Sequence, residues 1–134
     1  RGAMAYVKLY LSNGDLKSAL KYLNIAKVIN EKTFYLPFDV QLRVLENVYF
    51  FLKKDFDFAY QLAARNIKFI RSQEQNPVLQ EYVLIWKMIT SLINAVLKEE
   101  KISEVIIKEN TKLNQQYSNL YCNLIQILLE RATA

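Results

Sequence analysis

The 134-residue chain contains no histidine, one cysteine, two glycines and two prolines. Without histidine it has no Ser/His or Cys/His nucleophile pair, and it lacks the commonest zinc ligand. Two glycines cannot build a glycine-rich loop for phosphate. The lone Cys122 cannot form an internal disulfide, so a reducing, cytoplasmic location is the simplest interpretation. These absences argue against an enzyme, and we expect no catalytic residue, no cofactor and no metal site.

The scarcity of glycine and proline also bears on the fold. A β-sandwich or barrel needs many turns, and this chain has few residues that make them. Hydrophobic residues make up 52% of the sequence, including nine tyrosines, seven phenylalanines and one tryptophan. The composition therefore predicts an all-α domain of long helices joined by short connections.

The net charge of +5 is modest, and the lysines and arginines are spread along the chain. This balance favours weak attraction to acidic partners, but no nucleic-acid motif accompanies it. The longest apolar stretch, 78–97, is interrupted by several polar residues, so we expect no membrane span.

A helix-opening pattern occurs twice, about forty residues apart. Residues 14–19 read Gly-Asp-Leu-Lys-Ser-Ala, and residues 54–59 read Lys-Asp-Phe-Asp-Phe-Ala. Gly14 suits a left-handed turn that ends a helix, and Asp15 can cap the next one. A repeat at such a period indicates stacked helical hairpins.

Six helices are expected from the apolar periodicity and the end signals. They cover 6–11, a segment after Asp15, a segment from Pro37 to about Lys53, a segment after Asp55, 77–98, and a segment after Ser103. Residues 1–5 have the sequence of a remnant left by tag cleavage. We therefore expect the folded domain to be 6–134, as part of a longer protein.

The helices alternate between one and two apolar sides. The second expected helix has one buried stripe: Leu16, Ala19, Leu23, Ala26 and Ile29. The third has two stripes: Phe38, Leu42, Leu45, Tyr49 and Leu52, and then Val40, Val44, Val48 and Phe51. A helix with two apolar sides lies between neighbours, so the alternation predicts a two-layer array of about three antiparallel hairpins.

The spacing of Gly14, Ala19, Leu23 and Ala26 resembles that of a tetratricopeptide repeat (TPR). In the second unit Ala59 and Ala63 fill the small positions, Lys54 replaces the glycine, and Asn66 replaces a small residue. In the third unit Val105 and Glu109 depart from the pattern.

The longer period resembles divergent repeat proteins common in Bacteroidetes. The matching residues are Phe34, Tyr35, Asp39, Leu42, Leu45 and Tyr49. The resemblance covers 14–93. It implies an α–α superhelix of six helices and a protein-interaction role, and it carries over no catalytic or ligand residue.

The same resemblance implies that the first helix of each hairpin lines a concave groove for a peptide or partner helix. The residues expected there are Arg43, Asn47, Phe50, Lys87 and Asn94. Phe50 interrupts a polar strip and could anchor a partner. Packing beneath a neighbouring helix is the more ordinary role for such a residue.

Two other functions remain open. The sixth helix repeats Ile106, Leu113, Leu120 and Ile127 every seven residues, as in a sensor or dimerisation domain of a larger regulator. An outer basic face could bind nucleic acid through Lys17, Lys21, Lys27, Arg65, Lys68 and Arg71. Acidic residues lie among these cations, which favours an ordinary solvated surface.

Overall fold

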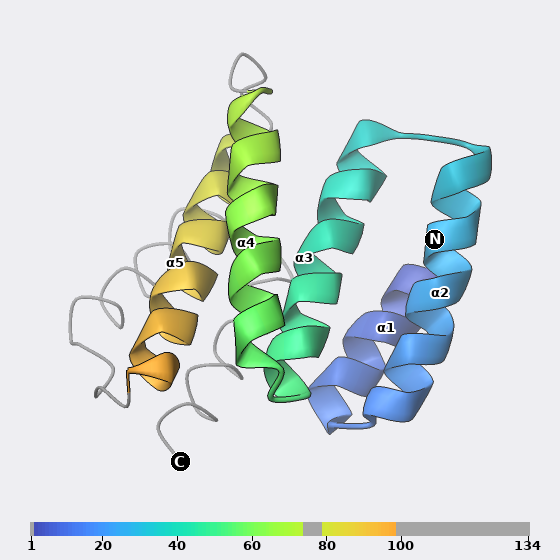
Figure 1. Ribbon diagram of the computed structural model, residues 1–134. Coiled ribbons are helices and arrows are strands. Elements are labelled where there is room, and N and C mark those ends of the chain that lie inside the picture. The colour runs from blue at the N-terminus through green and yellow to red at the C-terminus, as the bar shows by residue number, and fades with distance from the viewer. Residues whose placement is uncertain (1, 74–78, 99–134) are drawn as a thin grey trace. The chain divides into compact units, whose positions relative to one another are not determined.

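The computed structural model describes residues 2–73 and 79–98, which form five α-helices and no strand (Figure 1). The helices are α1 (Gly2–Asn13), α2 (Leu16–Lys32), α3 (Leu36–Leu52), α4 (Phe56–Arg71) and α5 (Gln80–Leu97). The all-α prediction is therefore confirmed for this part of the chain. The predicted sixth helix lies outside the described residues.

The chain divides into two compact units, Arg1–Asp55 and Phe56–Ala134. The first contains α1, α2 and α3, which all contact one another. In the second unit, α4 packs against α5.

The first helix is longer than the sequence suggested. We expected 6–11, but α1 begins at Gly2, and Met4, Val7 and Leu11 form its buried stripe. Their spacing of three and four residues places them on one side of the helix. Met4 extends this stripe by one turn, so residues 2–5 belong to the first hairpin rather than preceding it.

The turn between α1 and α2 closes as predicted. Gly14 has a positive φ of 77°. Its N–H donates to the carbonyl of Leu11 at 3.2 Å, and the N–H of Asp15 donates to the carbonyl of Tyr10 at 2.9 Å. These two bonds form the Schellman motif, which satisfies carbonyls at a helix end.

The turn between α3 and α4 repeats this geometry with a lysine in place of the glycine. Lys54 has a φ of 69°. Its N–H donates to Phe51 at 3.0 Å, and the N–H of Asp55 donates to Phe50 at 3.1 Å. The repeated sequence pattern therefore corresponds to a repeated backbone turn. At Lys54 the backbone of a non-glycine residue adopts the left-handed conformation, which costs free energy.

Lys54→Gly should stabilise the protein by about 1 kcal/mol, because glycine adopts a positive φ without that cost. The neighbouring Lys53 is also exposed but has a φ of −70°. Lys53→Gly should therefore destabilise the protein by up to about 1 kcal/mol. Urea unfolding followed by circular dichroism measures both changes. Shifts of the same sign would contradict the assigned turn.

Asp15 caps α2, as predicted. Its carboxylate accepts a hydrogen bond of 3.1 Å from the backbone N–H of Ser18. This backbone bond is the main reason why the pKa of Asp15 lies below its ordinary value of 3.8, and the Ser18 hydroxyl and Lys17 lower it further. Because the folded pKa is depressed, the carboxylate stabilises the fold above pH 3.8 and loses that effect as the pH falls through the folded pKa.

Asp15→Asn separates capping from titration, because asparagine caps helices well but carries no charge. Relative to this variant, the wild type should lose stability when the pH is lowered from neutrality to about pH 2. Urea unfolding of both proteins at the two pH values provides the test. A stability difference that stays constant would contradict a charged cap.

The apolar stripe of α2 is only partly buried. Ala19, Leu23 and Ala26 are buried as expected, but Ile29 is 41% exposed, so its predicted burial is wrong. The reason is length: α2 has 17 residues and α1 has 12, so the last turn of α2 extends past its antiparallel neighbour. Beside this stripe, the Tyr22 ring stacks on Tyr6 and Tyr10, with centroids 4.8 and 5.6 Å away.

The two apolar sides of α3 are confirmed. Of the nine residues in the two predicted stripes, all but Phe38 are buried. The helix begins at Leu36, so Pro37 stands at the second helical position rather than the first. Proline is tolerated there because the first-turn N–H groups have no partner within the helix.

On α4, the two small residues expected of the second repeat unit are buried. Ala59 and Ala63 are completely buried. Asn66 is buried too, and it makes polar or other specific interactions at a position where the repeat pattern has a small residue. On α5, Trp86 is completely buried, 6.5 Å from the Tyr82 ring. The predicted start of this helix at Asn76 and Pro77 lies outside the described residues.

Candidate functional site

A hollow of about 250 Å³ opens between α2 and α3 in the first unit. Lys27, Asn30 and Glu31 line it from α2, and Asp39, Leu42, Arg43 and Glu46 line it from α3. On each helix these residues recur at spacings of three and four, so they share one side of it.

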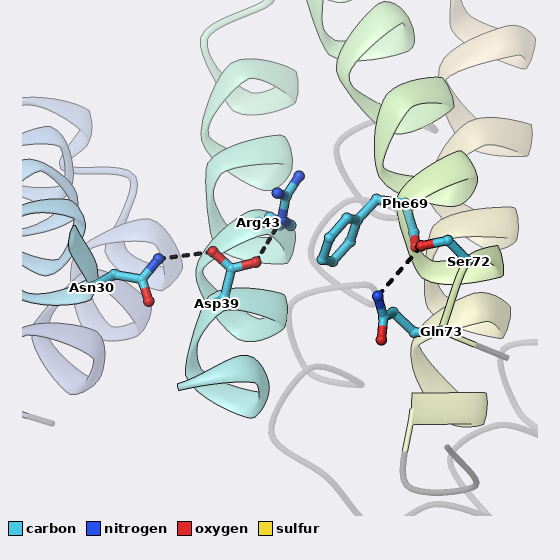
Figure 2. A network of polar contacts seen from close by, with 6 residues as sticks. All are labelled: Asn30, Asp39, Arg43, Phe69, Ser72 and Gln73. Carbon is cyan, nitrogen blue, oxygen red and sulfur yellow. Dashed lines mark hydrogen bonds and ion pairs between the residues drawn. The ribbon is translucent and has the colours of Figure 1, made fainter. Parts of the chain in front are cut away.

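Asp39 organises the polar contacts of this hollow (Figure 2). It is only 8% exposed. Its carboxylate accepts hydrogen bonds from Asn30 Nδ2 at 2.7 Å and from Arg43 Nε at 2.8 Å. Asp39 therefore joins α2 to α3 and also fixes the direction of the Arg43 side chain.

A second link between the helices is the ion pair of Lys27 with Glu46. The pairs Lys27–Glu46 and Asn30–Asp39 set an antiparallel register, because the residue numbers rise on one helix as they fall on the other. This register brings Leu20 of α2 and Phe50 of α3 to the same end of the hollow. Leu20 is 37% exposed and lies two turns before Lys27.

We call this side of the hairpin the α2–α3 seam. It comprises Leu20, Lys27, Asn30 and Glu31 of α2, and Asp39, Arg43, Glu46 and Phe50 of α3.

Two of the five predicted groove residues lie on this seam. Arg43 lines the hollow. Phe50 lies seven residues later on the same side of α3 and is partly exposed. Its ring meets Tyr49 edge-on at 5.1 Å, and the Lys53 ammonium lies 5.9 Å from its centroid.

The other three residues are placed differently. Asn47 is completely buried, so its side chain offers a partner no exposed surface. Lys87 is exposed and Asn94 partly exposed, seven residues apart on α5 in the second unit. A single groove shared by α3 and α5 remains a prediction.

One of the six cations expected on the outer basic face already has an acidic partner. Lys27 pairs with Glu46, which neutralises it. Lys17 and Lys21 are exposed on α2, and Lys21 lies 5.6 Å from the Tyr22 ring. The exposed cations Arg65, Lys68 and Arg71 belong to α4 in the second unit.

Sequence reasoning missed the polar contacts that link α2 to α3 across the hollow. Periodicity alone gives Asn30 no role and places Lys27 on an outer basic face. A spacing of four residues places Lys27 and Glu31 on one side of α2. That this side faces Asp39 and Glu46 depends on how α2 packs against α3, which a local sequence pattern does not specify.

Comparison with known proteins gave no match. No family model, curated protein or solved structure is similar to this chain at a significant level. Over residues 2–73 and 79–98, no acidic or sulfur-bearing side chains gather in the way a metal ion requires. Within the same ranges, none of the helices combines the length and apolarity needed to cross a membrane.

Proposed function

We propose that this chain is a TPR-like interaction module, an α–α superhelix that binds a peptide or helix of a partner protein. We further propose that the α2–α3 seam is part of its binding surface. The observation that carries this is the position of Arg43 and Phe50 on one side of α3, beside an open hollow.

The seam offers two kinds of recognition along its length. The end near Asp39 presents a charged hollow, and the other end presents the partly exposed Phe50 and Leu20. Aromatic side chains that fill apolar contacts supply much of the affinity of an interface, while charged groups supply specificity. A partner with one apolar and one polar end suits this arrangement.

The hydrogen bonds within the seam also favour binding. Arg43 is held by Asp39, and Asp39 by Asn30, so these side chains are ordered before a partner arrives. Ordering beforehand lowers the entropy lost on association. The proposal also assigns partner binding to Lys87 and Asn94 on α5 of the second unit.

Peptide selection provides a test that does not require the native partner. Peptides from a random display library are selected on the 134-residue chain, and the tightest is titrated against variants. Arg43→Glu should weaken binding about tenfold or more, because it reverses a charge on the seam. Arg65→Glu, an equally drastic change at an exposed residue of α4, should leave the affinity within about twofold.

Lys87→Glu reports on the second unit independently. If it also weakens binding, α5 takes part in binding the peptide. Equal affinity of the wild type and of the double variant Arg43→Glu, Lys87→Glu would overturn the proposed groove, as would failure to select any peptide.

A further inference from the structure

Exposed apolar side chains form a strip along α2, away from the residues that line the hollow. Ile25, Val28 and Ile29 recur at spacings of three and four residues, so they lie next to one another on the helix. Each is 40–48% exposed. A single exposed apolar residue is ordinary on a protein surface, but neighbouring ones indicate a place where something binds.

Tyrosine rings continue this strip onto α1. Tyr22 stands three residues before Ile25 on the same side of α2, and its ring stacks on Tyr6 of α1 with centroids 4.8 Å apart. Tyr6 is itself exposed, so the stacked rings offer surface as well as joining the two helices. We call this surface the α1–α2 exposed face; it comprises Tyr6, Tyr22, Ile25, Val28 and Ile29.

The charge beside the exposed face is of one sign. Lys21 and Lys32 are exposed, and each lies four residues from an apolar member of the strip, one at either end. The α1–α2 hairpin, residues 2–32, has only two acidic residues, and both are placed elsewhere: Asp15 caps α2, and Glu31 lines the hollow. The surroundings of the strip therefore favour an acidic partner.

We propose that the α1–α2 exposed face binds a helix of another protein whose apolar stripe is flanked by aspartate or glutamate. This surface is separate from the α2–α3 seam and adds a second contact to the function proposed above. Tyr22 and Ile29 lie about 10 Å apart along α2, which is two turns. Apolar residues at positions i, i+3 or i+4, and i+7 of a bound helix span that length.

The lysines and the narrowness of the strip argue against two other occupants. In a two-fold dimer the same surface meets itself, so Lys21 and Lys32 of one copy would approach the same cations of the other. Asn24, one turn before Val28, is exposed and polar, so the apolar surface ends there. A strip about one helix wide suits a helix better than the plane of a membrane.

Two synthetic helical peptides of about 20 residues provide the test. Both have the same leucine stripe, and their charged positions are all glutamate in the acidic peptide and all lysine in the basic one. Each is titrated into the isotope-labelled 134-residue chain while NMR follows the backbone amides. The acidic peptide should shift Tyr22, Ile25 and Ile29 most, and the basic peptide should bind about tenfold more weakly or not at all.

Two substitutions on α2 locate the contact. Val28→Glu places a charge in the strip at an exposed position where glutamate suits a helix, so the chain should fold and bind the acidic peptide about tenfold more weakly or worse. Leu20→Glu is the matched control, because it makes a similar change at an exposed residue of the α2–α3 seam. It should leave the affinity within about twofold.

The charge is tested by the double variant Lys21→Glu, Lys32→Glu. It should weaken the acidic peptide about fivefold or more and strengthen the basic one, because both exposed cations beside the strip are reversed. Equal binding of the two peptides to the wild type would overturn the proposal. Shifts confined to the seam would overturn it too, while leaving the proposed function intact.

The alternative occupants give outcomes of their own. A dimer of the chain alone, measured by light scattering and abolished by Val28→Glu, would assign the exposed face to a second copy and overturn the proposal. Binding to phosphatidylglycerol vesicles that depends on Val28, without binding of the acidic peptide, would assign the face to lipid and overturn it equally.

Discussion

Replacing Trp86 with alanine should destabilise the second unit by about 3–5 kcal/mol. Trp86 is completely buried on α5, which packs against α4. The substitution removes the largest side chain of this hairpin and leaves a cavity that its neighbours cannot fully close. Since domains are stable by only about 5–15 kcal/mol, the variant should unfold at a much lower urea concentration, as measured by far-ultraviolet circular dichroism.

Trp86→Phe is the matched control, because the indole has one feature that does not help the fold. Its Nε1–H is buried without an acceptor among the described residues. Phenylalanine keeps an aromatic ring and removes this unpaired donor, so the loss in area is partly offset. We expect a cost of about 1 kcal/mol or less. Equal losses for the Phe and Ala variants would contradict an unpaired indole, and a stable Ala variant would contradict its place in the core.

The second large effect is expected at Asp39, where alanine should cost about 2–3 kcal/mol. Its carboxylate is the shared acceptor for Asn30 and Arg43, and it is only 8% exposed. Truncation to alanine leaves the Asn30 amide and the Arg43 guanidinium, both partly buried, without their shared carboxylate acceptor. The Arg43 side chain also loses its hold, so binding of a selected peptide should weaken together with stability.

Two control variants isolate the role of Asp39. Glu31→Ala removes an exposed carboxylate from the same hollow and should change stability by less than about 0.5 kcal/mol. Asp39→Asn keeps the shape and one carbonyl acceptor, so its cost should fall between those of the two alanine variants. Equal urea midpoints for Asp39→Ala and Glu31→Ala would contradict the link between α2 and α3.

Much of the fold was predictable because it depends on local rules. Gly14 requires a positive φ, Asp15 can reach the first free N–H groups of α2, and the two apolar stripes of α3 follow from a period of 3.6 residues. The repeat pattern gives Lys54 the position in the second unit that Gly14 has in the first, and both residues have a positive φ in the same kind of turn.

The errors arose where an outcome depends on a neighbouring helix. Ile29 belongs to the apolar stripe of α2, but α1 is too short to cover it. Asn47 belongs to the predicted polar strip of α3, yet it is completely buried. Sequence periodicity gives the side of a helix on which a residue lies, but it does not give the length or register of the helix that covers that side.

The same limit applies to the candidate site. Arg43 and Phe50 were selected from one helix, and they do share a side of it. The α2 residues that line the hollow beside Arg43 follow only from the pairs of Lys27 with Glu46 and of Asn30 with Asp39. Both pairs join helices across a connection, and no local pattern specifies them.

The most direct measurement of the central claim is a map of backbone amide NMR shifts when the tightest selected peptide is added to the 134-residue chain. The claim that the α2–α3 seam binds partners predicts the largest changes around Leu20, Lys27 and Glu31 of α2, and around Arg43 and Phe50 of α3. Changes confined to the exposed cations of α4, with the seam unperturbed, would contradict it.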